Sequence, residues 1–173
     1  MDEMSMVRIL QTTRHDLMNN LQVIQGYLSM DKIDVVKKKL AECIDYYDQE
    51  RKLININAPH FILWVIQFNH RHENIQLIYH IEGENLDLGK VDQLLVKDSD
   101  YVVNMINKLG SKMELYEIKL ELIKVSKSKV KLSFTIFGQC EWLNDYKNNE
   151  QNKSICVKES DDDIIYELLY TIE

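Results

Sequence analysis

The first 28 residues repeat apolar side chains at spacings of three, four and seven, the pattern of a long amphipathic helix. At about 100° per residue, one stripe of this helix collects Met6, Leu10, Leu17, Leu21, Ile24 and Leu28. A second helical pattern with the same spacing covers residues 33–54. Because only residues 29–32 separate the two patterns, they predict an antiparallel helical hairpin.

Two helices alone leave much of each apolar stripe in water. A second copy of the hairpin would cover both stripes in a four-helix bundle with two-fold symmetry. We therefore expect a homodimer whose core contains Leu10, Leu17, Leu21, Ile24 and Leu28. The alternative is that the hairpin packs on the C-terminal half of its own chain.

The pattern changes after Pro59, the single proline of the chain. Helices are predicted over residues 60–74, 91–109 and 141–147, and alternating strands over residues 76–81, 116–123, 130–137, 155–159 and 164–172. Helices on one face of a mostly antiparallel sheet form an α/β sandwich. The predicted fold class is thus α+β, with a helical hairpin over residues 1–56 and an α/β domain over residues 57–173.

Composition narrows the classes of function. The 173 residues, 45% hydrophobic and 28% charged, are typical of a soluble globular protein. A net charge of −7 disfavours nucleic acid and anionic membranes as partners. No apolar run approaches the roughly 20 residues of a membrane span, and the N-terminus does not resemble a signal peptide. Cys43, Cys140 and Cys156 are widely spaced and fit reduced thiols, so we expect a cytoplasmic protein.

The spacing of the histidines does not favour a metal site. His70 and His72 stand two residues apart, with His60 and His80 further along the chain. An i,i+2 pair does not converge on one helix face, and no carboxylate or thiol spacing supports a site. We therefore expect no metal bound by this chain.

His15 points roughly 140° away from the apolar stripe of its helix. Its neighbours on that far side are small or uncharged: Gln11, Thr12, Asn19, Gln22 and Gly26. Solvated helix faces usually carry Lys and Glu, and this chain uses charge freely elsewhere, as in the lysine run at residues 37–39. The pattern favours an imidazole presented to a partner over the alternative of an ordinary exposed histidine.

The residues around His15 also form a known motif. Residues 14–28 read R-H-D-x-x-N-x-L-x-x-I-x-G-x-L, which resembles the phosphoacceptor box of two-component histidine kinases. Within that group the order is most similar to that of the sporulation initiation phosphotransferases. The resemblance implies a C-terminal domain built like the ATP-binding domain of a histidine kinase.

The glycines argue against ATP in that domain. Kinases of this group hold phosphates in Gly-x-Gly loops, because backbone N–H groups must approach the oxygens closely. This chain has five glycines and no Gly-x-Gly. We therefore expect a kinase-like domain without an ATP site.

The resemblance implies that His15 is the phosphoacceptor of a phosphorelay that controls sporulation initiation. A neutral imidazole is a good nucleophile near pH 7. His15 would accept a phosphoryl group from the aspartate of one response-regulator receiver domain and pass it to the aspartate of a second. No cofactor of its own is expected, because the receiver would supply Mg²⁺.

Supporting and docking roles follow from the same helix face. Asn19 would bond to the partner or to a phosphoryl oxygen, Arg14 would offset the incoming negative charge, and Asp16 would orient Nδ1 or pair with Arg14. The expected docking residues are Gln11, Thr12, Met18, Gln22, Val23 and Gly26. Two alternatives remain: an ATP-dependent sensor histidine kinase fragment, and a non-catalytic dimeric module that sequesters a receiver domain or kinase.

Overall fold

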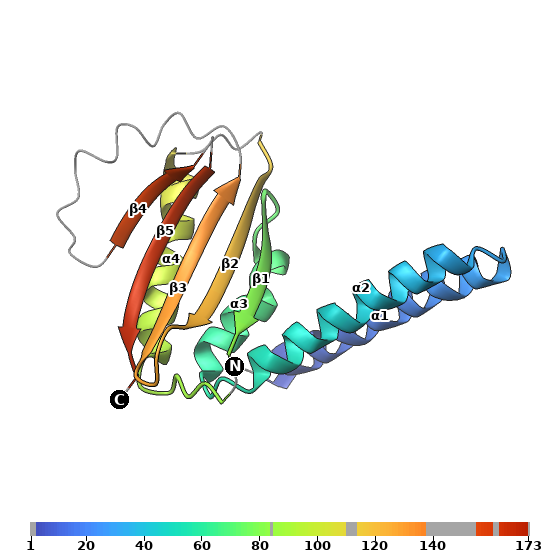
Figure 1. Ribbon diagram of the computed structural model, residues 1–173, viewed down its shortest axis with the longest axis horizontal. Helices are drawn as coiled ribbons and strands as arrows, with labels where there is room; N and C mark the ends of the chain where they lie inside the picture. The colour runs from blue at the N-terminus through green and yellow to red at the C-terminus, as the bar shows by residue number, and fades with distance from the viewer. Residues whose placement is uncertain (1–2, 84, 110–113, 138–154, 161–162, 173) are drawn as a thin grey trace. The chain divides into compact units, whose positions relative to one another are not determined.

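The computed structural model describes residues 3–83, 85–109, 114–137, 155–160 and 163–172. Within the chain, contacts define two compact units, Met1–Arg51 and Lys52–Glu173. The elements, shown in Figure 1, are α1 (Glu3–Ser29), α2 (Ile33–Ile54), α3 (Pro59–Arg71), β1 (Ile75–Glu82), α4 (Asp92–Leu109), β2 (Tyr116–Lys124), β3 (Lys129–Phe137), β4 (Ile155–Ser160) and β5 (Asp163–Thr171). The helix expected over residues 141–147 lies outside the described residues.

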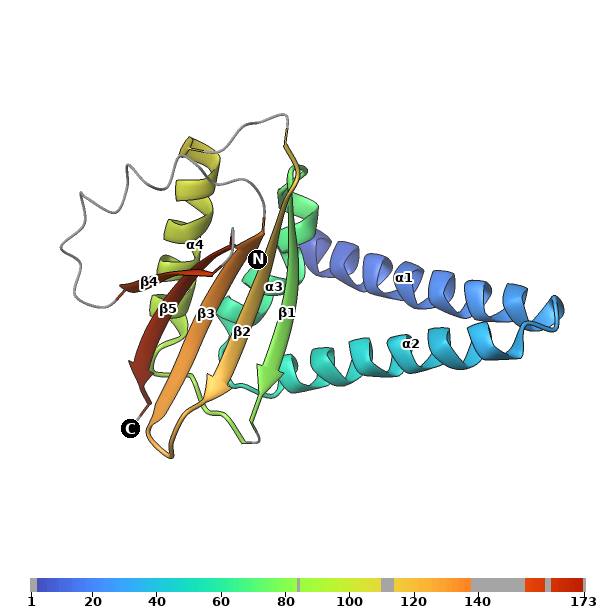
Figure 2. The same cartoon turned by 45° about the horizontal axis from the view of Figure 1, so that its top comes forward.

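The first unit is an antiparallel hairpin of α1 and α2, as the spacing of apolar residues predicts (Figure 2). The turn closes through Asp31, whose φ of 55° lies in the left-handed region that Asp tolerates better than most residues. The Lys32 N–H donates to the Tyr27 carbonyl at 3.0 Å and satisfies one of the last carbonyls of α1. The short connection therefore fixes the register of the two helices.

The apolar stripe of this hairpin is open in the single chain. Leu10, Leu17, Leu21 and Leu28 are 37% to 66% exposed, whereas Ile24 is half-buried. Leu40 and Ile44 leave a matching stripe on α2, at 45% and 60% exposure. The solvent-exposed apolar stripe is therefore present, as the sequence predicts for two helices alone. The homodimer that would cover it remains a prediction.

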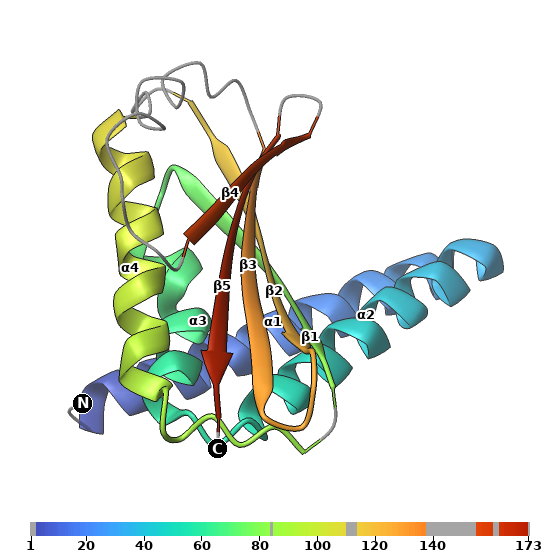
Figure 3. The same ribbon diagram turned by 60° about the vertical axis from the view of Figure 1, so that its left-hand side comes forward.

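The second unit is a five-stranded sheet in the order β1-β2-β3-β5-β4. β1 pairs with β2 in parallel, and the other pairs are antiparallel. α3 and α4 cover one face of the sheet (Figure 3), and the buried residues of the strands face them. The α+β class and the mostly antiparallel α/β sandwich are confirmed.

In or next to the second unit, the packing of one helix end and the position of another differ from what the apolar pattern predicts. Leu53 and Ile56 are buried in its core, so the last turn of α2 belongs to this unit, while the boundary after residue 56 remains a prediction. α3 ends at Arg71, three residues before the expected end at residue 74. His72 is extended, with φ −123° and ψ 109°, because the chain must turn before β1 begins at Ile75.

A buried carboxylate joins the beginnings of α3 and α4. The N-cap residue of α3, Ala58, has no side chain that can cap the helix. Asp92 at the start of α4 does this instead, accepting hydrogen bonds from the backbone N–H groups of His60 at 3.1 Å and Phe61 at 2.8 Å. It also lies 2.7 Å from Nδ1 of His60. Asp92 thus supplies across space what an N-cap side chain supplies locally.

We expect Asp92→Asn to lower the free energy of unfolding by about 1–3 kcal/mol at pH 7. Burial disfavours the charge of Asp92, but the hydrogen bonds from the His60 ring and from the Phe61 and His60 backbone outweigh it and lower its pKa. A lowered carboxyl pKa stabilises the fold above the unfolded pKa of about 3.9, and this contribution disappears as pH falls through the folded pKa. Urea unfolding at pH 7 and pH 3 measures the difference in the free energy of unfolding between wild type and Asp92→Asn. A difference that stays constant with pH would contradict this role for the charge.

Candidate functional site

His15 lies in the middle of α1 with 71% of its side chain exposed. Its Nδ1 is 3.4 Å from Oδ1 of Asp16 and 3.2 Å from Nδ2 of Asn19. Of the two roles considered for Asp16, the structure shows the contact with Nδ1. The predicted acceptor and its two polar neighbours therefore form one small cluster on the helix surface.

The contact with Asp16 bears on the tautomer of the imidazole. A carboxylate only accepts hydrogen bonds, so this contact is a hydrogen bond in the tautomer that carries the ring proton on Nδ1. The amide of Asn19 can donate through Nδ2 or, turned about its χ2 bond, accept through Oδ1 from the same Nδ1–H. With the proton on Nδ1, the lone pair of Nε2 is available as a nucleophile. In this tautomer Asp16 contacts the nitrogen that does not react, whereas Nδ2 of Asn19 lies 3.2 Å from Nδ1 and 3.5 Å from Nε2.

The expected docking residues spread over the same side of α1. Arg14, Gln11, Met18, Gln22, Val23 and Gly26 are exposed, and Thr12 is half-buried. The Thr12 hydroxyl donates to the carbonyl of Arg8 at 3.0 Å, so it is partly committed to its own helix. Nothing lies within 4 Å of the position that a Cβ on Gly26 would occupy. A partner can therefore approach the backbone closely at this point.

The residues that sequence reasoning missed come from α2. A hairpin that turns at Asp31 brings residue 31−15 opposite residue 31+15, which places Tyr46 level with Asp16. Burial first, and then the charges of Glu50 and Asp16, raise the pKa of Tyr46. Burial also raises the pKa of Tyr47, with Asp16 again among the contributing charges. The register of the hairpin was the signal that could have found them.

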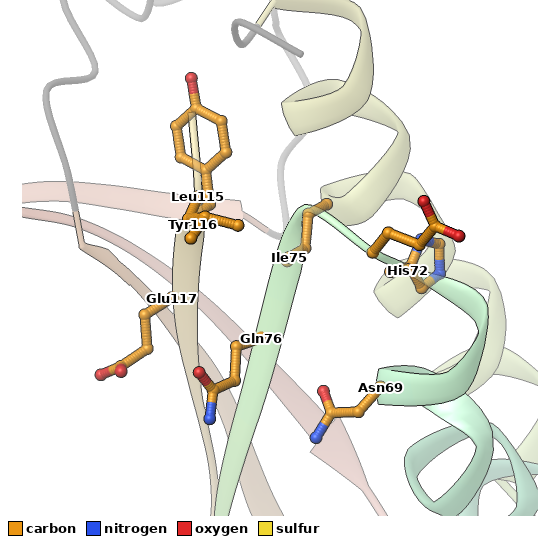
Figure 4. Close-up of a pocket in the computed structure, with 8 residues that line it drawn as sticks. Asn69, His72, Ile75, Gln76, Leu115, Tyr116 and Glu117 are labelled. Carbon is orange, nitrogen blue, oxygen red and sulfur yellow. The ribbon is translucent and has the colours of Figure 1, made fainter. Parts of the chain in front are cut away.

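A separate groove of about 450 Å³ lies in the second unit (Figure 4). It lies at the end of α3 and the first residues of β1 and β2, and its lining residues are Asn69, His72, Glu73, Ile75, Gln76, Leu115, Tyr116 and Glu117. The Asn69 amide is committed to the backbone of Leu77, at 2.7 Å and 3.1 Å. Within the described ranges, no group of three or more His, Cys, Asp or Glu side chains could hold a metal ion.

The comparisons with known proteins agree with the motif around His15. Residues 1–56 match the family model described as Sensor_kinase_SpoOB-type, alpha-helical domain. The chain is also 37% identical over 92 residues to sporulation initiation phosphotransferase B of Bacillus subtilis (strain 168), an alignment that covers 53% of this chain and 48% of that protein. The matched region thus spans about half the length of this curated relative. The resemblance recognised from residues 14–28 is confirmed.

Among solved structures, similar chains are histidine kinases. The histidine kinase ThkA in complex with the response regulator protein TrrA is 14% identical, with a TM-score of 0.43 over 96% of this chain and 61% of that one. The Erythrobacter litoralis EL346 blue-light activated histidine kinase is 11% identical, with a TM-score of 0.46 over 95% and 59% of the two chains. No helix in the described part of the present chain is long and apolar enough to cross a membrane.

Proposed function

We propose that this chain is a phosphotransferase of the sporulation phosphorelay that works through a phosphohistidine at His15. The observation that carries the proposal is the position of this side chain. It is 71% exposed, its Nδ1 is close to Asp16 and Asn19, and it lies in the region that matches the sporulation-type helical domain. A second copy of the chain would complete a four-helix bundle around the open apolar stripe.

The reaction follows from the chemistry of the imidazole. The lone pair of Nε2 attacks the phosphorus of an aspartyl phosphate on a receiver domain, and an N–P bond forms as the P–O bond to the aspartate breaks. The aspartate leaves as a carboxylate with the bonding electron pair. Asp16 holds the Nδ1–H and offsets the positive charge that develops on the ring. A Mg²⁺ ion held by the receiver would offset the charge of the phosphoryl oxygens.

The same geometry serves the second transfer. The carboxylate of another receiver attacks the phosphorus, the N–P bond breaks, and Nε2 regains its lone pair. An acyl phosphate and a phosphoramidate are both high-energy linkages, so the relay can run in either direction. The open surface around His15 allows both receivers to use one site in turn.

The test is phosphoryl transfer in the absence of ATP. A receiver domain is phosphorylated with radiolabelled acetyl phosphate and freed of the reagent. It is then mixed with the full chain and Mg²⁺. We expect label to leave the receiver, to appear on this chain, and to move on to a second, unphosphorylated receiver. No label on the chain would favour the sequestering module. In a separate incubation with Mg·ATP and no receiver, binding of the nucleotide and self-phosphorylation would favour the kinase.

Shortening either of two docking side chains should weaken binding of the receiver without lowering the stability of the fold. We expect Val23→Ala and Asn19→Ala each to raise the apparent KM for a phosphorylated receiver about three- to tenfold, because each removes a contact worth about 1 kcal/mol. Both side chains are exposed, so the melting temperature should barely change. Gln25→Ala, at another exposed position of α1, is the matched control.

The salt dependence of the same reaction is also predicted. The face around His15 is nearly uncharged and the chain carries a net charge of −7, so screening should leave the rate unchanged or raise it modestly. A steep loss of rate with added salt would show that basic residues such as Arg14 steer the encounter.

A further inference from the structure

Two tyrosines of α2, Tyr46 and Tyr47, stand level with Asp16 in the register of the hairpin. The rings of Tyr46 and Tyr47 meet edge to face, with centroids 5.2 Å apart and an interplanar angle of 89°. Tyr47 is half-buried and its hydroxyl is buried, whereas Tyr46 is 50% exposed. The inner ring therefore supports the outer one, which remains in reach of a partner.

Tyr46 does not belong to the apolar stripe of α2. At about 100° per residue it lies roughly 120° from Leu40 and roughly 160° from Ile44, the two residues that define the exposed stripe of that helix. A second copy of the chain that covers this stripe would leave Tyr46 uncovered. On α1, Asp16, Asn19 and Val23 lie on the corresponding outer side, so these residues and Tyr46 share one face of the hairpin.

We propose that Tyr46, supported by Tyr47, is the α2 part of the surface on which a receiver domain with a phosphorylated aspartate docks. The inference rests on the proposed function. Transfer requires the phosphorus to come within bonding reach of the His15 ring, so the receiver must cover the side chains immediately around it. Asp16 lies 3.4 Å from Nδ1 of His15, and the register of the hairpin places Tyr46 level with it on the neighbouring helix.

The chemistry of the tyrosine suits this occupant. Its ring supplies a large apolar contact with little conformational entropy to lose, and its hydroxyl adds a directional hydrogen bond. A tyrosine hydroxyl is protonated at neutral pH, so it can donate to a carbonyl or carboxylate of the receiver near the phosphorylated residue. The ring supplies the larger part of the contact and the hydroxyl the smaller part.

Transfer kinetics with the full chain test the inference. Wild type, Tyr46→Ala and Tyr46→Phe are compared with two phosphodonors: a receiver phosphorylated by acetyl phosphate, and phosphoramidate, which needs no docking surface. We expect Tyr46→Ala to raise KM for the receiver about tenfold with little change in kcat. Its phosphorylation by phosphoramidate and its sedimentation should match wild type, and Tyr46→Phe should recover most of the affinity. Met30→Ala, an exposed apolar position at the hairpin turn, is the control.

The outcomes separate this inference from the proposed function. An unchanged KM for Tyr46→Ala, while wild type accepts phosphate from the receiver, would overturn the docking role alone. A parallel loss with both donors would mean that Tyr46 is structural, and a change in oligomeric state would assign it to the contact between copies. Either result overturns the inference. If wild type accepts phosphate from neither donor, the proposed function fails and the inference fails with it.

Discussion

His15→Gln is expected to abolish phosphoryl transfer, to below about one thousandth of the wild-type rate, while leaving the protein folded. An amide has no lone pair that can form an N–P bond, so no neighbouring group can replace the imidazole. The side chain is 71% exposed and its described contacts are with Asp16 and Asn19 on the surface of its own helix. Surface substitutions of this kind change stability by about 0.5 kcal/mol or less.

The measurement is single-turnover transfer from a phosphorylated receiver, with a melting curve on the same preparation. His80→Gln is the matched control, because it removes an exposed histidine from β1 and should leave transfer intact. Phosphoryl transfer by the His15→Gln variant at the wild-type rate would contradict the assignment of His15 as the phosphoacceptor. A fall of many degrees in melting temperature would show that the imidazole supports the fold.

Leu21→Asp and Leu17→Asp are each expected to convert the dimer to monomer or aggregate. Both positions are partly exposed in the single chain, so a carboxylate costs the isolated hairpin little. In a four-helix bundle the same group would be buried without a partner, at a cost of several kcal/mol per site. Sedimentation velocity reports the oligomeric state, and circular dichroism shows whether the helices persist.

The control for this pair is Gln22→Asp, which adds the same charge on the far side of α1. We expect that variant to sediment as the wild type does. A stable dimer with Asp at position 17 or 21 would mean that the copies associate through other residues. A wild type that is monomeric at micromolar concentration would exclude the bundle itself.

The helical hairpin could be predicted closely because its signals are local. The spacing of Leu10, Leu17, Leu21 and Leu28 defines the stripe, and a four-residue gap between two long patterns leaves the chain no choice but to reverse. The strands followed from alternation in the same way. The end of α3 has no such local signal, because residues 72–74 contain neither the glycine nor the proline that commonly marks a helix end.

The features of the candidate site also differ in whether local sequence can predict them. The exposure of His15 and the nearness of Asn19 follow from the geometry of one helix, so a motif and a period suffice. The placement of Tyr46 level with Asp16 depends on the register between two helices, and the hydrogen bond between Asp92 and His60 joins residues 32 positions apart. No local pattern encodes contacts of this kind, because they are created by tertiary packing.

The central claim is that the phosphoryl group resides on His15, and mapping that group tests it most directly. The full chain is incubated with a phosphorylated receiver and Mg²⁺ without ATP, digested at alkaline pH, and sequenced by mass spectrometry. The account predicts one phosphorylated site, at His15, that survives base and is lost in acid, as a phosphoramidate is. Phosphate on another residue, or none on a chain that binds the receiver, would contradict it.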